Sequence, residues 1–194
     1  MPKNGKPGTY RVIQAFAGPY KGQFALDLGF SNYLSLEDAS SRRWPQEIAK
    51  NSGERRGATV NDFKDREIVE FAKGKLKSSD RTEADLFTYE AYIYKVLDGD
   101  TIMAVVDLGF GITTTQTLRL RGIDCPEIQT RDGMEAKEFV ETSLKGADYL
   151  TIKTVKSDKY DRYLTDVFVE QKNGSNLYLN NELIEKGLAV RVRE

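Results

Sequence analysis

Apolar and polar residues alternate along much of the second half of this chain, a pattern typical of strands. In the segment 101–108, TIMAVVDL, the residues Ile102, Ala104 and Val106 recur at every second position and therefore share one face. Four further segments have the composition and turn-bounded character of strands. They are 89–97, 115–123, 150–156 and 164–171.

One stretch has the periodicity of a helix instead. Ala136 and Phe139 belong to a stripe of apolar residues at the i, i+3, i+4 spacing of a buried helix face. The sequence Asp132–Glu135 resembles a capping box and predicts that the helix begins there. A shorter helix is predicted at 180–186, because Gly187 is a good C-cap.

The order of these elements indicates the fold. Three strands, a helix and two strands form the order of a five-stranded OB-type barrel. We therefore predict a mainly β (α+β) protein with an OB-fold barrel and helices at 86–194. The polar run 78–85, which lacks periodicity, is the predicted linker that separates this barrel from residues 1–85.

Residues 1–85 predict a small α+β N-terminal module of unknown function. Two strands are expected at 10–18 and 22–30, and a helix is expected to begin near Ser35. A second helix is expected from Asn61 to about Lys77. The lysines near its end fit either a solvated helix terminus or a patch that contacts phosphate.

The absence of histidine limits the chemistry that this chain can perform. It excludes histidine general bases, Ser-His and Cys-His nucleophile pairs, and almost all zinc and iron sites. The single cysteine, Cys125, excludes an internal disulfide. Any catalysis must therefore use carboxylates, lysines, arginines, tyrosines or a hard metal ion.

Charge is distributed unevenly between the two predicted parts. Residues 1–85 carry 15 Lys+Arg and 12 Asp+Glu, whereas residues 86–194 carry 14 and 18. The second part thus has a net charge of −4, which weakens the electrostatic capture of nucleic acid that a basic protein would have.

Nothing in the sequence predicts an association with a membrane. No apolar run approaches the ~20 residues that a membrane-spanning helix needs. The first residues, MPKNGKPGTYR, have no apolar core and no cleavage-like site, so no signal peptide is predicted. The chain as it stands is expected to be cytoplasmic, and secretion remains an alternative if a signal has been removed.

Three polar clusters lie between predicted strands or at a strand end. They are DGDT at 98–101, RLRGIDCPE at 119–127 and DKYDR at 158–162. Taken singly, the first fits a tight β-turn, the second a strand end with surface ion pairs, and the third a polar loop.

Taken together, the clusters contain the groups needed to cleave a phosphodiester. The carboxylates of Asp100, Asp124 and Glu127 are ligands that a hard divalent cation prefers. Arg119 and Arg162 provide planar guanidinium groups that match phosphate oxygens and remain charged. Glu127 is also a candidate to accept or orient the proton of an attacking water.

With these residues in view, residues 88–192 resemble the staphylococcal nuclease (thermonuclease-like) family. The three clusters occur in that family's order and at similar spacings. The resemblance implies an OB-fold, Ca²⁺-dependent endonuclease that hydrolyses DNA and/or RNA and leaves 3′-phosphate ends.

The resemblance also implies roles for the acidic cluster. Asp100 and Asp124 match the family's metal-binding carboxylates. Cys125 falls where the family offers a backbone carbonyl to the ion, so its thiol is not required. Glu127 falls on the family's general-base glutamate, and a contact with the metal through a water is the further role expected for it.

Basic and aromatic positions are carried over in the same way. Arg119 and Arg162 fall on the family's two phosphate-binding arginines. Lys159 and Tyr160 match positions that contact another phosphate of the substrate. Arg121 has no counterpart role, but strand alternation puts it on the same face as Arg119, where it would add a phosphate contact or only an ion pair.

One departure and two alternatives remain open at the level of sequence. Asp161 stands where the family usually has glycine, so it could pair with Arg162 or repel substrate. The alternative function is a catalytically inactive OB-fold module that binds nucleic acid. Residues 1–85 are a candidate accessory domain that recruits substrate or a protein partner.

Overall fold

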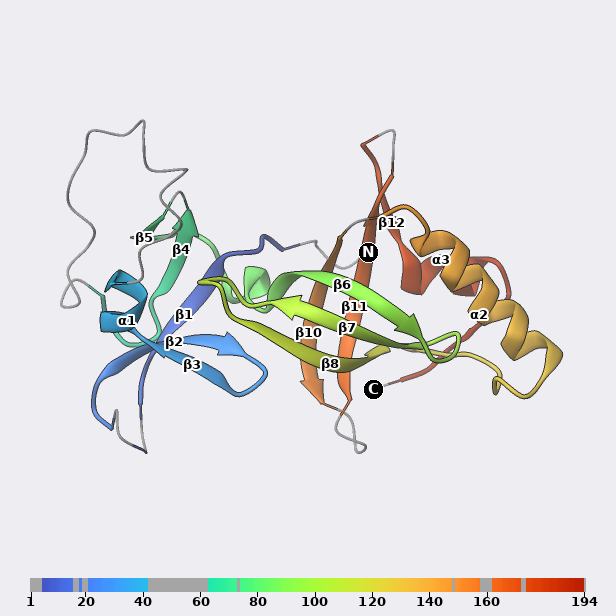
Figure 1. Cartoon of the computed structure of the whole chain (residues 1–194), viewed down its shortest axis with the longest axis horizontal. Helices are drawn as coiled ribbons and strands as arrows, with labels where there is room; N and C mark the ends of the chain where they lie inside the picture. The colour runs from blue at the N-terminus through green and yellow to red at the C-terminus, as the bar shows by residue number, and fades with distance from the viewer. Residues whose placement is uncertain are drawn as a thin grey trace. The chain divides into compact units, whose positions relative to one another are not determined.

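The computed structural model describes residues 5–15, 18, 21–41, 63–72, 74–147, 149–157, 162–171 and 174–193 (Figure 1). The chain forms two compact units. The C-terminal unit contains 88–107 and 113–194, and the N-terminal unit contains 5–87 and 108–112. The functional division into an accessory module and a nuclease-like domain stays a prediction.

The C-terminal unit is built around a closed five-stranded barrel, as the order of elements predicted. The strands follow the order β10-β6-β7-β8-β11, and β10 also pairs with β11 to close the barrel. All these pairings are antiparallel except that of β8 with β11. The bounds are β6 Thr88–Val96, β7 Thr101–Asp107, β8 Thr113–Leu120, β10 Leu150–Ser157 and β11 Tyr163–Glu170.

Alternation along the strands fills the barrel with apolar side chains. Ile102, Ala104 and Val106 of β7 are fully buried, which confirms the face predicted from their spacing. Leu118 of β8, which pairs with Ile102, and Ile152 of β10 are equally buried. The mainly β, OB-like architecture expected for this part of the chain is therefore confirmed.

Two helices pack on the barrel (Figure 1). The helix α2, Arg131–Leu144, packs on β6 and on α3, Leu179–Glu185, which in turn packs on β11. The N-cap of α2 is Thr130, whose side chain accepts a hydrogen bond from Gly133 N, so the capping box expected at Asp132 was placed two residues late. As predicted, α3 ends before Gly187, which has a φ of 73°.

Short strands complete this unit. β12, Asn176–Tyr178, extends the sheet beside β11. β9, Ile123–Asp124, pairs with β13, Val190–Arg191, and this pairing ties the segment that follows β8 to the end of the described chain.

The N-terminal unit contains a five-stranded antiparallel sheet of order β3-β2-β1-β4-β5. Its elements are β1 Thr9–Gln14, β2 Phe24–Gly29, β3 Asn32–Ser35, α1 Leu36–Ser41, β4 Ile68–Ala72 and β5 Lys75–Ser78. The two predicted strands and the predicted helix start are confirmed. Ser35 Oγ accepts from Asp38 N at 3.1 Å and so caps α1.

The helix expected at 61–77 is wrong. The part of this segment from Ile68 on forms the strands β4 and β5, joined around Gly74, whose φ of 72° suits a tight hairpin turn. Val69 is buried in the sheet. The pairing of β4 with its neighbouring strands therefore determines the local structure, although the apolar residues have the spacing of a helix. Asn61 itself lies outside the described residues.

The polar run expected as a linker is an ordered part of the N-terminal unit. Thr82 precedes a 3₁₀ helix, η3 Glu83–Asp85, and the side chains of Thr82 and Asp85 form a capping box. Asp85 is buried and lies 3.5 Å from Arg81, an ion pair that the sequence pattern did not reveal.

The connection between β7 and β8 contributes aromatic packing to the N-terminal unit. Phe110 packs against Tyr10 and Phe71, with ring centroids 5.3 Å and 4.3 Å apart. The hydroxyl of Tyr10 donates to the carbonyl of Leu108 at 2.9 Å. A side chain at Gly109 would place its Cβ 2.1 Å from that hydroxyl, so glycine is needed there.

In the part of the chain that the structure describes, no helix has both the length and the apolar character needed to cross a membrane.

Candidate active site

The first polar cluster forms the turn between β6 and β7, as expected. Thr101 O accepts from Leu97 N at 2.9 Å, and Asp98 Oδ1 accepts from Asp100 N at 3.0 Å. Gly99 has no space for a side chain, because a Cβ there would lie 2.7 Å from Ala136 Cβ and 2.8 Å from Cys125 Sγ. The turn therefore packs closely against α2 and against the segment after β9.

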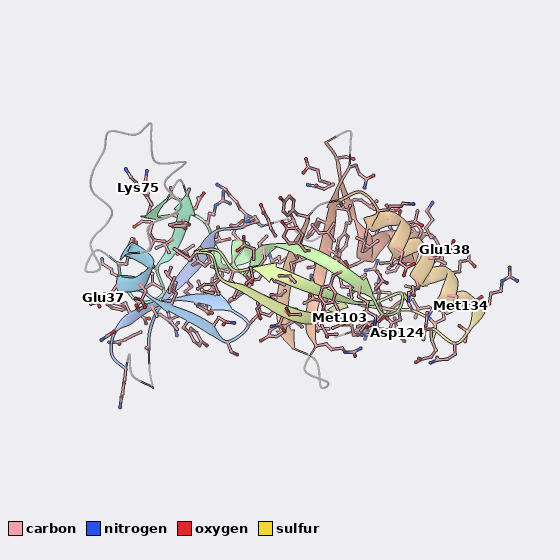
Figure 2. The ribbon with its side chains drawn as sticks, viewed as in Figure 1. Glu37, Lys75, Met103, Asp124, Met134 and Glu138 are labelled. Carbon is pink, nitrogen blue, oxygen red and sulfur yellow. The ribbon has the colours of Figure 1, made fainter. Side chains whose placement is uncertain are left out.

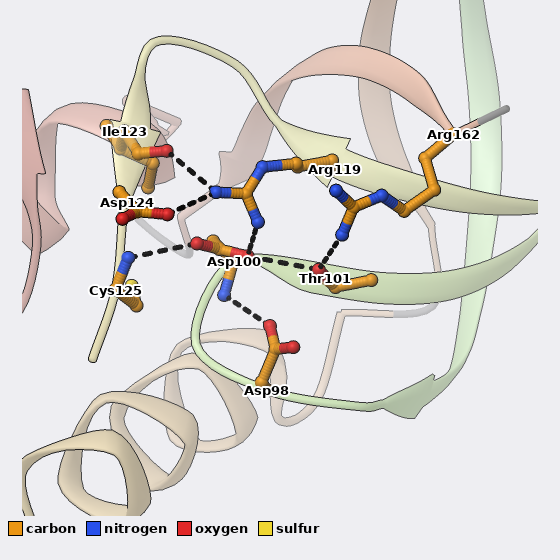
Figure 3. Close-up of polar contacts among 8 residues, drawn as sticks. All are labelled: Asp98, Asp100, Thr101, Arg119, Ile123, Asp124, Cys125 and Arg162. Carbon is orange, nitrogen blue, oxygen red and sulfur yellow. Dashed lines mark hydrogen bonds and ion pairs between the residues drawn. The ribbon is translucent and has the colours of Figure 1, made fainter. Parts of the chain in front are cut away.

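Asp100 is the buried centre of the site (Figure 3). Its Oδ1 accepts from Thr101 Oγ1 at 3.0 Å and from Arg119 Nη1. Its Oδ2 accepts from Cys125 N at 2.9 Å. Burial raises the pKa of this carboxyl above its ordinary value, and the bonds from Cys125 and Thr101 and the charge of Arg119 oppose that rise.

Arg119, near the end of β8, joins the two aspartates that were expected to bind a metal. Nη1 donates to Asp100 and Nη2 donates to Asp124 Oδ1. Nη2 also lies 3.5 Å from the carbonyl oxygen of Ile123. Oxygen atoms of three residues therefore converge on one cationic group, and the bend at Gly122, with a φ of 72°, brings the last two into place.

Arg162 approaches the same network from the start of β11. Its Nη1 lies 3.4 Å from Thr101 Oγ1, which donates to Asp100. The parallel pairing of β8 and β11 sets Leu164 opposite Arg119, so the two arginines come from neighbouring strands. The structure thus brings together Asp100, Asp124 and both arginines from the three clusters.

Arg121 faces a different partner. Its Nε donates to Asp166 Oδ1 at 3.1 Å and its Nη2 donates to Asp166 Oδ2 at 2.6 Å. Asp166 is fully buried and also accepts from the hydroxyl of Tyr178 at 2.8 Å. Burial and the adjacent Asp166 raise the pKa of Tyr178. Of the two alternatives for Arg121, the structure records the ion pair.

Glu127 is exposed, and its main-chain carbonyl takes part in the start of α2. Its carbonyl accepts from Thr130 N at 2.9 Å and from Thr130 Oγ1 at 2.7 Å. Gly133 packs against that carbonyl so closely that a Cβ would lie 2.1 Å from the oxygen. The cap of α2 therefore determines where the Glu127 main chain lies.

The acidic side chains do not form a larger cluster. Within the described residues, no group of three or more Asp, Glu, Cys or His side chains is placed so that it could hold a metal ion. Asp100 and Asp124 form a pair across Arg119, and Glu127 is not a third member.

Cys125 contributes its main chain to the site and its side chain to packing. The backbone N–H bonds Asp100, and the sulfur lies beside Gly99. Burial, reinforced by the charges of Asp100 and Asp98, raises the pKa of the thiol to about 12. The thiol is therefore protonated at neutral pH and unsuited to nucleophilic chemistry.

Some expected residues lie outside the described part of the chain, and others were missed. Lys159, Tyr160 and Asp161 fall among residues that the structure does not describe. The carbonyl of Ile123 and the hydroxyl of Thr101 join the site without having been singled out. Thr101 stood inside the DGDT motif and could have been found there, whereas a carbonyl carries no sequence signal.

Comparisons with known proteins agree with the geometry. Residues 117–194 match the family described as Staphylococcal nuclease homologue, which confirms the expected resemblance for this part of the chain. An uncharacterized protein of Methanocaldococcus jannaschii, MJ1439, is 30% identical over an alignment of 130 residues, with coverage of 53% of this chain and 60% of that protein. Endonuclease YhcR of Bacillus subtilis is 32% identical over an alignment of 114 residues, with coverage of 52% of this chain and 9% of that protein.

Proposed function

We propose that this protein is a Ca²⁺-dependent endonuclease that hydrolyses phosphodiester bonds of DNA and/or RNA and leaves 3′-phosphate ends. The match of residues 117–194 to the staphylococcal nuclease family and the similarity to an endonuclease support a nuclease-type domain. We propose in addition the identity of the metal, the products and the roles of single residues.

One observation supports the proposal most strongly. Two arginines and two aspartates from three separate segments meet in one connected network around Asp100. Asp100 is buried and bonded to one guanidinium, that of Arg119, and Thr101 links it to the second, that of Arg162. Burial penalises the charge of this carboxylate. Such an arrangement suits a site where phosphate and a cation are bound together.

The donor atoms near Arg119 are of the type that a hard divalent cation prefers. Oxygens of Asp100, Asp124 and Ile123 already surround one positive group, the guanidinium of Arg119. Ca²⁺ prefers carboxylate, carbonyl and water oxygens of this kind. Asp100 and Asp124 would hold the ion, the carbonyl of Cys125 and a water-mediated contact from Glu127 would complete the set, and the ion would stabilise negative charge on the phosphate.

The remaining chemistry belongs to the side chains of the chain itself. Arg119 and Arg162 bind the phosphate oxygens and neutralise the charge that grows on them during the reaction. Glu127 takes a proton from the attacking water, whose oxygen bonds to phosphorus as the bond to the 5′-oxygen breaks. Lys159 and Tyr160 contact a neighbouring phosphate of the substrate.

Digestion of single- and double-stranded DNA and of RNA, with Ca²⁺ and with excess chelator, tests the proposal. We expect cleavage only with Ca²⁺, and end-group analysis should find phosphate on the 3′ ends. Cleavage that is unchanged in excess chelator would refute the metal-dependent mechanism, and 5′-phosphate products would refute the stated bond cleavage.

A catalytically inactive module that binds nucleic acid is the second candidate. Exposed aromatic side chains on the barrel, Tyr92 at 46% and Tyr94 at 53%, are the observation that favours it. Tyr89, by contrast, is buried and unavailable for stacking. Binding of an oligonucleotide without metal-stimulated nicking of a plasmid would favour this module over the enzyme.

The role of residues 1–85 as an accessory domain that recruits substrate or a protein partner stays a prediction. The charge surplus of this segment is its only support.

A further inference from the structure

A groove lies between β6 and α2, apart from the residues of the proposed reaction. Its volume is about 510 Å³, within the range of about 300–1,000 Å³ that is usual for ligand sites. The β6–α2 groove is lined chiefly by Tyr94, Lys95 and Val96 on β6 and by Lys137, Leu144 and Lys145 on α2 and its C-cap.

The charge of this groove differs from that of the surrounding domain. Three lysines line it against one acidic residue, Glu141, which pairs with Lys137 at 3.7 Å. Residues 86–194 as a whole carry more acidic than basic side chains. A local surplus of positive charge on a domain of negative net charge attracts a polyanion to that place in particular.

Apolar and aromatic surface accompanies the lysines. Tyr94 is 53% exposed, and the side chains of Val96 and Leu144 line the groove beside it. Aromatic rings next to cationic side chains are the combination with which OB-type proteins bind single strands, because every base can stack and every phosphate can pair.

Charge also limits how far this surface extends along β6. Tyr92 packs edge-on against Tyr149, with ring centroids 4.8 Å apart, and this pair is exposed. The hydrogen bond with Tyr149 is the main cause of the raised pKa of Tyr92, and the negative charges of Glu90 and Asp107 add to it. That end of the strand would repel phosphate, so the favourable surface ends at Tyr94.

The groove is connected to the candidate active site by direct packing. Ala136 of α2 is the residue that Gly99 of the Asp98–Asp100 turn approaches most closely. Lys137 follows Ala136, and β6, which carries Lys95, leads directly into the same turn. Figure 2 labels Met134 and Glu138, two exposed residues of the same helix.

We propose that the β6–α2 groove binds a single-stranded segment of the nucleic-acid substrate away from the bond that is cleaved. Lys95, Lys137 and Lys145 pair with its phosphates and Tyr94 stacks on a base. This proposal rests on the proposed nuclease function, and it adds a second contact region that raises affinity for longer substrates.

Binding measured without cleavage tests the groove separately from catalysis. A labelled single-stranded oligonucleotide of about 16 nucleotides is titrated with the full chain in excess chelator, at several salt concentrations. The double variant K95Q/K145Q is compared with wild type and with Lys186→Gln, an exposed lysine at the end of α3 that serves as a matched control.

The logarithm of the binding constant is plotted against the logarithm of the salt concentration. Each lost phosphate contact with a single strand lowers the magnitude of the slope by about 0.7, so we expect a decrease of about 1.4 when both lysines are removed. The control should keep the wild-type slope. Tyr94→Ala should weaken binding ~5–150-fold, and Tyr33→Ala, which removes an exposed tyrosine of the N-terminal unit, should not.

The outcomes separate the two proposals. Equal slopes and affinities for wild type and groove variants, with Ca²⁺-dependent cleavage present, would overturn the groove and leave the nuclease standing. Failure of the wild type both to bind and to cleave would overturn both. Weakened binding to the long oligonucleotide, with cleavage of a dinucleotide substrate unchanged, would establish the groove as a region outside the reacting centre.

Discussion

The guanidinium of Arg119 donates to the buried carboxylate of Asp100 and, through its other terminal nitrogen, to Asp124. These two carboxylates are the proposed ligands of a divalent cation. Arg119 and a metal ion at this place would therefore compete for the same oxygens. Binding of the proposed ion would require Arg119 to turn away from the carboxylates, and its guanidinium would then be available to a phosphate.

This competition predicts a stability effect that does not depend on activity. In Arg119→Ala the two carboxylates lose their shared cation, so Ca²⁺ should raise the melting temperature more in the variant than in wild type. Differential scanning calorimetry with and without Ca²⁺ measures the difference. Equal shifts in the two proteins would show that Arg119 and the ion do not share these oxygens.

Loss of either arginine that is proposed to bind phosphate should reduce catalysis. Arg119→Ala and Arg162→Ala should each lower kcat by at least ~10²–10³, the usual effect of removing one donor aimed at the transition state. Arg119→Lys should recover little, because an ammonium cannot reproduce the fork of a guanidinium. The matched control is Arg131→Ala, at an exposed arginine that begins α2. An equally large drop of kcat in this control would argue against specific roles of Arg119 and Arg162.

Arg121 should act on stability rather than on the reaction. Arg121→Ala leaves the carboxylate of Asp166, whose side chain is 1% exposed, without its guanidinium, so unfolding in urea should show a loss of about 3–5 kcal/mol. The kcat of the folded variant should match that of wild type. A higher KM for nucleic acid with unchanged stability would instead favour a phosphate contact.

The close packing at Gly133 predicts that the addition of one methyl group there destabilises the protein. Gly133→Ala would place a Cβ 2.1 Å from the carbonyl of Glu127, and relief of that clash should cost about 1–3 kcal/mol and move Glu127. Both the melting temperature and kcat should fall. Met134→Ala, at an exposed position of the same helix, should change neither, and a neutral Gly133→Ala would show that the segment can move without consequence.

The thiol of Cys125 should react slowly. With its pKa raised to about 12, alkylation by iodoacetamide at pH 8 should be about a thousandfold slower than for a free thiol, and it should accelerate about tenfold per pH unit. Because the folded thiol holds its proton more tightly than the unfolded one, this group contributes stability below its ordinary pKa of 9.0, which is lost as pH rises toward 12. Alkylation in urea is the control, and equal rates in folded and unfolded protein would contradict the burial argument.

Alternation of apolar residues in one segment, with composition and turn boundaries in four others, was sufficient to predict the barrel strands. The three clusters, considered together, also identified the pair of aspartates and the pair of arginines that the structure brings into one network. Periodicity failed at 61–77, where Gly74 allows a hairpin and the sheet supplies partners that no local pattern records. The capping-box pattern placed the start of α2 at Asp132, whereas Thr130 is the residue whose side-chain oxygen accepts a hydrogen bond from the N–H of Gly133.

The sequence by itself determined which chemical groups are present: carboxylates, guanidinium groups and a single thiol, with no histidine. Only the tertiary structure decided what each group faces. Arg119 and Arg121 are two residues apart on the chain, yet one meets Asp100 and the other meets Asp166. Their roles differ because the chain turns after Leu120, and a side chain acquires its partners from strand pairing and packing across the barrel rather than from its neighbours in sequence.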